Sequence, residues 1–171
     1  MYDPTHFENL KVAFENRIYD LDNIDGLITI VNRADLTDYA VLSRKFSIQF
    51  ALTGLLDVTA EVVLIASLED LAGEILEMPA ATPGCSLVLR FYKRIHEVPV
   101  QCGKIEEALN AVWENDIELS QTLSFEYGEE FSGYLDQIEV KFKTKISENN
   151  MREIVPFLEH VLKSLELLNG I

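Results

Sequence analysis

Cysteine is scarce in this chain, which has only two among its 171 residues, Cys85 and Cys102. A small secreted domain held by disulfides normally carries more, so a disulfide framework is excluded. The chain also lacks the basic start and apolar core of a secretory signal peptide. Its longest apolar run, residues 62–66, is far too short to span a membrane. These absences predict a cytoplasmic protein with no membrane-spanning segment.

Basic side chains are outnumbered two to one. There are 14 lysines and arginines against 29 aspartates and glutamates, and the formal net charge is −15. The acids are spread along the chain, with 14 in residues 1–85 and 15 in residues 86–171. Such a field repels the phosphates of nucleic acids and of anionic membranes, so neither is a predicted partner. It is compatible with basic proteins, basic peptides or divalent cations, and it also serves solubility.

Length and composition are those of one globular domain. The hydrophobic fraction is 48% and the charged fraction 25%, which are ordinary values for a folded domain. We therefore predict a single domain over residues 1–171. The stretch 78–84 contains two prolines and a glycine, and we expect it to be a loop inside that domain.

Strand patterns are clearest in the middle of the chain. Apolar residues alternate with others over residues 46–52, which predicts a half-buried strand. Residues 59–66 are apolar on both faces and predict a central strand covered on both sides. Ser67 with Asp70 three residues later predicts the start of a helix, and Pro79 its end.

The second half of the chain predicts strand, helix, hairpin and helix in that order. Residues 87–91 alternate as a strand, and a helical stripe follows, beginning at about Lys104. Two strands joined by residues 128–133 then predict an antiparallel hairpin. A long apolar stripe from about Asn149 predicts a C-terminal helix, with a possible kink at Pro156 inside it.

The N-terminal segment is ambiguous. Residues 5–22 fit either one helical face or a hairpin that turns near residues 15–16, and the hairpin is slightly favoured because strand-type alternation and β-favouring residues occur there. Residues 27–32 predict a strand. Residues 35–38 resemble a capping box, which predicts a short helix to about Ser43.

Taken together, these elements predict the α+β class. We expect a mostly antiparallel or mixed sheet of about six to eight strands. Three to four helices should pack mainly on one face of it, and a long helix should end the chain.

A thiol near a helix start is one candidate site. Cys102 lies just before the predicted helix, whose N-terminus would favour the thiolate, and Lys104 would add to the effect. His96 is the histidine that could approach it. A small enzyme using Cys102 is therefore one alternative, although a free cysteine is more often a small buried hydrophobe.

Clustered acids give a second alternative. Asp20, Asp22 and Asp25 invite a divalent-cation site, but the spacing fails the EF-hand rule, because Ile24 and Val31 occupy positions that need oxygen ligands. A polar turn explains the same residues. No glycine-rich phosphate loop and no zinc-type ligand set are present, so no cofactor or metal is predicted.

The predicted C-terminal helix has an unusually broad apolar arc. A helix that covers one sheet face needs an apolar stripe of only about 100°. The surplus predicts a dimer surface, formed by Val155, Leu158, Leu162 and Leu165.

These observations favour a non-enzymatic binding or regulatory protein that forms a homodimer and binds a protein or peptide. The order strand–helix–strand–strand–helix in the second half, together with the acidic charge, resembles the small acidic secretion chaperones of the type III class. That resemblance implies dimerisation and capture of an extended peptide by an exposed sheet edge.

Overall fold

The computed structural model describes residues 6–79 and 84–171. The α-helices of this part are α1 (His6–Asn23), α2 (Leu68–Ile75), α3 (Val98–Val112) and α4 (Ile154–Asn169). The strands are β1 (Ile28–Asp38), β2 (Ser43–Leu52), β3 (Leu55–Ala66), β4 (Ser86–Ile95), β5 (Ile117–Ser124) and β6 (Tyr134–Phe142). Two 3-10 segments are η1 (Glu130–Ser132) and η2 (Glu148–Glu153).

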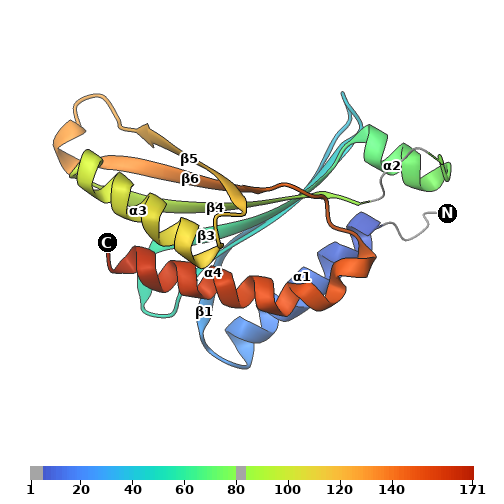
Figure 1. The fold of residues 1–171 in the computed structure, drawn as a ribbon, viewed down its shortest axis with the longest axis horizontal. Coiled ribbons are helices and arrows are strands. Elements are labelled where there is room, and N and C mark those ends of the chain that lie inside the picture. The colour runs from blue at the N-terminus through green and yellow to red at the C-terminus, as the bar shows by residue number, and fades with distance from the viewer. Residues whose placement is uncertain (1–5, 80–83) are drawn as a thin grey trace.

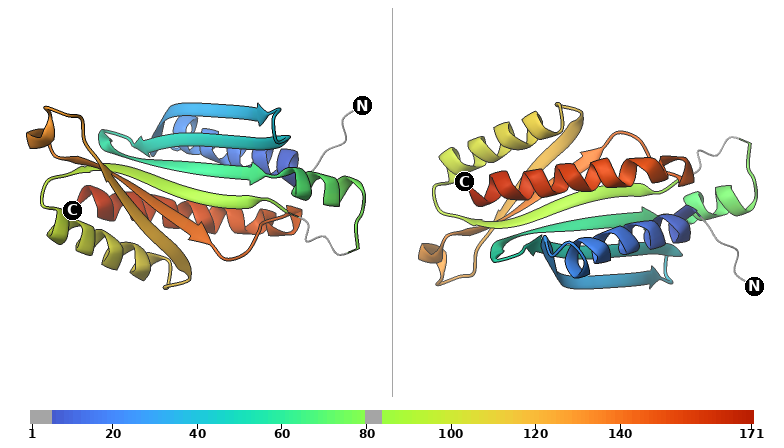
Figure 2. Two further views of the ribbon diagram at one scale, coloured as in Figure 1. Left: turned by 90° about the horizontal axis from the view of Figure 1, so that it is seen from above. Right: turned by 90° about the horizontal axis from the view of Figure 1, so that it is seen from below.

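The six strands form one sheet in the order β1-β2-β3-β4-β6-β5, and every neighbouring pair is antiparallel. Helices α1, α3 and α4 lie together on one side of this sheet, and α2 lies at one end of it (Figure 1). Seen from above and below, α1 runs along β1, β2 and β3 while α4 runs along the middle of the sheet (Figure 2). The predicted α+β class is confirmed.

The two faces of the sheet differ in chemistry. The face under the helices carries alternate apolar residues such as Phe50, Val62 and Leu89, all completely buried in one continuous core. On the other face Arg90 bonds Glu139 at 2.9 Å and contacts Glu61 at 3.5 Å. This alternation is typical of an antiparallel sheet with one face toward solvent. Residues 59–66 were expected to be covered on both sides. Their helix side is buried, and on the other side Val63 is fully buried while Thr59, Glu61 and Ile65 are half-buried.

The N-terminal segment is a helix, so the preference for a hairpin near residues 15–16 was wrong. Its apolar residues recur every three or four positions and all are buried: Phe7, Leu10, Phe14, Ile18 and Leu21. The alternation that suggested a strand runs through Leu10, Val12 and Phe14, but Val12 is 46% exposed. Burial of the whole stripe against the sheet decides between the two patterns, because packing supplies most of the stability of a helix in a protein.

The short helix predicted from Asp35 to about Ser43 is also wrong. Residues 35–38 are the end of β1, with Asp35 opposite Phe46 and Asp38 opposite Ser43, and residues 39–42 form the turn to β2. The aspartates make other bonds than helix caps: the Asp38 carboxylate accepts from the backbone N–H of Ala40 in the hairpin turn. An acidic residue is as well suited to a turn as to a helix start.

Other local predictions are confirmed. Ser67 and Asp70 form a complete capping box at the start of α2. The predicted hairpin of the second half is the antiparallel pair β5–β6. The loop predicted at residues 78–84 lies partly outside the described residues.

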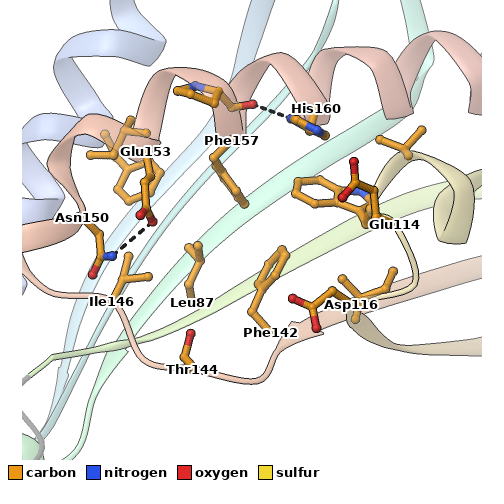
Figure 3. Close-up of a pocket in the computed structure, with 16 residues that line it drawn as sticks. Leu87, Glu114, Asp116, Phe142, Thr144, Ile146, Asn150, Glu153, Phe157 and His160 are labelled. Carbon is orange, nitrogen blue, oxygen red and sulfur yellow. Dashed lines mark hydrogen bonds between the residues drawn. The ribbon is translucent and has the colours of Figure 1, made fainter.

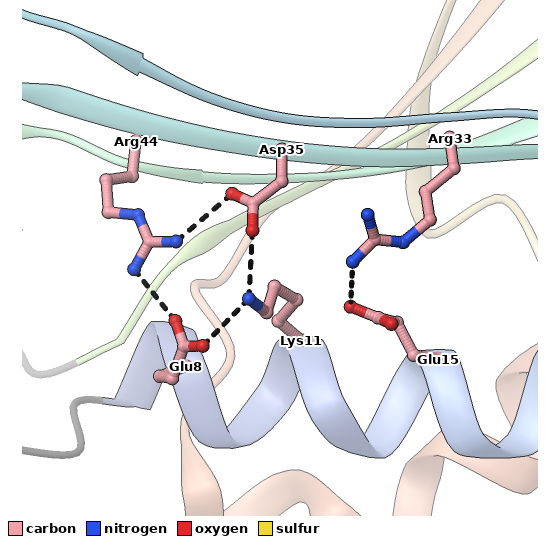
Figure 4. Close-up of polar contacts among 6 residues, drawn as sticks. All are labelled: Glu8, Lys11, Glu15, Arg33, Asp35 and Arg44. Carbon is pink, nitrogen blue, oxygen red and sulfur yellow. Dashed lines mark hydrogen bonds and ion pairs between the residues drawn. The ribbon is translucent and has the colours of Figure 1, made fainter.

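A group of partly buried charges ties α1 to the β1–β2 hairpin (Figure 4). Lys11 donates to Glu8 at 2.7 Å and to Asp35 at 2.9 Å, and Arg44 bonds the same two carboxylates. Burial works to raise the pKa of Glu8 and Asp35, but the hydrogen bonds from Lys11 and Arg44 prevail and lower the pKa of both. The ionised carboxylates are therefore stabilised in the folded chain.

We expect Lys11→Met to lower the free energy of unfolding by about 2 kcal/mol at neutral pH, because it leaves two partly buried carboxylates with one cation. Carboxyls whose pKa is lowered contribute stability above their ordinary pKa and lose it as the pH falls through the folded value. The loss should therefore shrink in acid. Urea unfolding at several pH values measures this loss of stability.

Arg33→Met is the control, because it removes the more exposed pair with Glu15. It should lower the free energy of unfolding by less than about 1 kcal/mol. Equal losses for the two variants would contradict this account.

Candidate ligand-binding pocket

A cavity of about 460 Å³ opens between the C-terminal end of α3, the N-terminal half of α4 and the ends of β4 and β6 (Figure 3). Its floor is formed by strand residues of the sheet, including Leu87 and Phe142. Its walls come from Trp113, the residue directly after α3, and from Phe157 of α4. The volume is in the range of sites that hold a small molecule or a large side chain.

Aromatic rings form one wall of the pocket. The ring of Trp113 lies 5.3 Å from that of Phe142 and 5.6 Å from that of Phe157, centre to centre, and the two phenylalanine rings are 5.7 Å apart. Phe14 of α1 packs edge-on against Phe157 at 5.8 Å from beneath. Edge-to-face pairs of this kind hold their rings in fixed orientations, so the pocket has a rigid apolar wall.

Hydrogen bonds fix the orientation of Trp113, the only tryptophan in the chain. Its indole N–H donates to the hydroxyl of Ser164 at 3.2 Å, and that hydroxyl donates to the carbonyl of His160 at 2.8 Å. His160 lies against the indole at 5.2 Å and its Nδ1 is 2.7 Å from the carbonyl of Pro156. Since a carbonyl only accepts, Nδ1 carries a proton.

The mouth of the pocket is acidic. Glu114, Asp116 and Glu153 line it, and no lysine or arginine is among the lining residues. The amide of Asn150 donates to the Glu153 carboxylate at 3.1 Å. Asp116 is paired at 3.2 Å with Lys143, and both of these side chains are largely exposed.

The turn between α3 and β5 brings two of these acids to the pocket. Glu114 and Asn115 both have positive φ, 54° and 60°. Asparagine tolerates this left-handed conformation, whereas glutamate adopts it at a cost of about 1 kcal/mol or more. The tight turn reverses the chain directly after Trp113, so both Glu114 and Asp116 line the pocket.

Cys102 is not at a helix start. Helix α3 begins at Val98, with Pro99 in its first turn, so Cys102 lies in the second turn. Burial and the neighbouring Asp136 raise the pKa of the thiol, which is the opposite of thiolate activation. No hydrogen bond or ion pair joins it to His96 or Lys104 in the part of the chain that the structure describes, and the latter two are exposed. The structure does not bring this candidate site together.

The three N-terminal aspartates are dispersed. Asp20 and Asp22 lie in the last turns of α1, and Asp25 lies in the turn that follows. The carboxylate of Asp22 accepts from the backbone N–H of Ile30 at 3.1 Å, which joins the helix end to β1. Across residues 6–79 and 84–171, no three histidine, cysteine or acidic side chains are placed to hold a metal ion.

The broad apolar arc of α4 is used mostly inside the chain. Leu158 is 2% exposed and Leu165 is fully buried, whereas Leu162 is half-buried and Val155 is 41% exposed. The helix begins at Ile154, after the 3-10 segment η2, so Pro156 lies in its first turn, where proline is tolerated. A dimer through this helix, which remains a prediction, would have Val155 and the outer side of Leu162 available for contact.

The pocket residues were not predicted as a site. In the sequence, Trp113 is the last apolar residue of a predicted helix stripe. Phe142 and Phe157 lie at apolar positions of a predicted strand and of the predicted C-terminal helix, where core residues are expected. The one signal in the sequence is that a single tryptophan is followed directly by two acids within three residues.

Comparisons with protein-family models, with curated proteins and with solved structures found no match. The described helices include none that is long and apolar enough to cross a membrane.

Proposed function

We propose that this protein is a non-enzymatic binding protein that holds a segment of a protein partner, with one side chain of that segment in the pocket between α3, α4 and the sheet. The observation that carries the proposal is the pocket itself, with its rigid aromatic wall and open mouth. Neither cysteine, serine nor lysine lines it, and its one histidine is bonded to a backbone carbonyl. Such a lining favours binding over covalent chemistry.

Aromatic side chains buried at the centre of a contact are typical anchors of protein recognition. The pocket has room for one large side chain and lies at the surface, where a chain can pass across its mouth. The acidic surface of the molecule favours a partner that is not itself acidic.

Trp113 provides a direct test, because it is the only tryptophan and lines the pocket. Peptides selected from a displayed random library on the full chain should shift its fluorescence on binding. Thr144→Tyr, at the exposed rim of the pocket, should weaken their binding by about tenfold or more, by filling the space. Thr122→Tyr is the matched control, since Thr122 is an exposed strand residue outside the pocket. Selected peptides that leave the Trp113 fluorescence unchanged, or that bind both variants equally, would refute the proposal.

Self-association and a cytoplasmic location belong to the same proposal. Val155 on α4 is an exposed apolar residue that supports a contact between copies, and both cysteines are free, as is usual in a reducing compartment. Sedimentation at micromolar concentration tests the first part, and a species of 19.4 kDa alone would remove it.

A further inference from the structure

We infer that the side chain held in the pocket is a cation on an apolar stem, arginine above all, so that the protein selects basic segments. This inference rests on the proposed function and narrows its ligand. It depends on three features of the pocket: the aromatic wall, the carboxylates at its mouth and the absence of lysine and arginine among the lining residues.

The aromatic wall suits the stem and the head of an arginine side chain. The stem is three methylene groups, which pack against apolar surface, while the planar guanidinium stacks on an aromatic face. Such a cation is attracted by the negative face of a ring, most strongly by tryptophan. The chain already uses this contact elsewhere: the guanidinium carbon of Arg44 lies 4.6 Å from the centre of the Phe7 ring.

The carboxylates at the mouth supply the charge. Glu114 and Glu153 form no ion pair with any of the described residues. Glu8 and Asp35, in contrast, are both paired with a lysine of the same chain. Asp116 is paired with Lys143, but both side chains are largely exposed, and an exposed ion pair of this kind is weak. A cation that enters between Glu114 and Glu153 would therefore meet two carboxylates with no cation bound to them.

Other ligand charges fit less well. An anionic side chain would approach three carboxylates on a molecule of net charge −15. A neutral apolar side chain would fill the aromatic part but would leave the carboxylates at the mouth poorly solvated and without a partner. Arginine satisfies both parts at once, because its fork of N–H groups matches a carboxylate in two bonds.

The test uses peptides from the same selection in matched pairs, each with one arginine replaced by citrulline, which keeps the shape and removes the charge. Affinity is measured by Trp113 fluorescence on the full chain. The arginine peptides should bind about tenfold tighter or more, and the difference should decrease with salt. Glu153→Gln should weaken the arginine peptide several-fold and leave the citrulline peptide unchanged.

Glu114→Gly adds a readout that a structural role would not produce. Its positive φ favours glycine, so the variant should unfold at the same temperature as the wild type or higher, while it binds the arginine peptide more weakly. Glu77→Gly is the matched control: Glu77 also has a positive φ, 48°, but lies outside the pocket, so affinity should not change.

Two results separate this inference from the proposed function. If citrulline and arginine peptides bind equally, or if the selected peptides contain no basic residue, while Thr144→Tyr still weakens binding, then the cation is wrong and the peptide site stands. If Thr144→Tyr changes the binding of no selected peptide, both the proposed binding site and its preference for arginine are refuted.

Discussion

Replacing Asp136 with asparagine is expected to raise the free energy of unfolding by about 2 kcal/mol at about pH 8 and to change it little at about pH 4. Asp136 is fully buried on the helix side of β6, and neither of its carboxyl oxygens has a hydrogen-bond partner among the residues that the structure describes. Burial raises the pKa of this carboxyl from 3.8 to about 6. The folded chain therefore holds the proton more tightly than the unfolded chain does.

The direction of the pH effect follows from that difference. An acid whose pKa is raised by folding costs nothing below its ordinary pKa, and the cost grows as the pH rises from about 4 to about 6. The difference between the two pKa values corresponds to a loss of about 3 kcal/mol in the free energy of unfolding at higher pH. Asparagine removes the charge but keeps a buried polar group, so we expect about two thirds of that amount to be recovered.

Two neighbours of Asp136 matter to this result. Cys102 faces it from α3, and Lys93 lies directly opposite it on β4. Burial lowers the pKa of Lys93, with Asp57 acting against it, and the described residues contain no ion pair between Lys93 and Asp136. Urea unfolding of the wild type and Asp136→Asn at several pH values measures the effect, and Asp20→Asn, at an exposed site, should change it by less than about 0.5 kcal/mol. A loss of stability at high pH would mean that Lys93 pairs with Asp136 in solution.

Gly133→Ala is expected to lower the free energy of unfolding by about 3 kcal/mol or more. Gly133 lies between η1 and β6 with φ 91° and ψ −168°, a region open only to glycine. A Cβ atom there would lie 2.5 Å from the carbonyl oxygen of Ile95 and 2.6 Å from Nδ1 of His96. The clash with Ile95 is with backbone, which moves only if the end of β4 shifts.

Gly128→Ala separates backbone strain from this clash. Gly128 is in the same connection with φ 88°, but apart from its chain neighbours no atom of the described residues lies within 4 Å of where its Cβ would be. Its substitution should cost only the left-handed conformation, about 1 kcal/mol. Thermal or urea unfolding of both variants gives the difference. Similar losses would show that the connection does not pack closely on the end of β4.

The elements that the sequence predicted well are those decided by local chemistry. The capping box at Ser67 and Asp70, the alternation along β2 and the β5–β6 hairpin each depend on a few neighbouring residues. The start of α3 was predicted at about Lys104, six residues late, because the apolar stripe of the helix is clear only from Ile105 onward, whereas the helix begins at Val98 with Pro99 in its first turn.

The remaining features depend on residues that are distant in the sequence. Asp35 looks like a helix cap until Lys11 and Arg44 are placed beside it. The pocket brings together four aromatic rings from different elements: Phe14, Trp113, Phe142 and Phe157. No spacing within a single segment predicts that they are neighbours. Asp136 reads as an ordinary polar position of a strand, since nothing near it in the sequence shows that α3 covers it.

The order of strands in the sheet has a consequence for how the chain folds. Strands β1, β2 and β3 follow one another through short turns, and β5 and β6 form a second local hairpin. Strand β4 joins these two units in the sheet: it pairs with β3 on one side and with β6 on the other, where Val88 lies opposite Lys141. Closing a long loop costs more entropy than closing a short one. We therefore expect the two units to form early and the β4–β6 seam late. The pocket, whose floor crosses that seam, would then be completed only when the two units have joined.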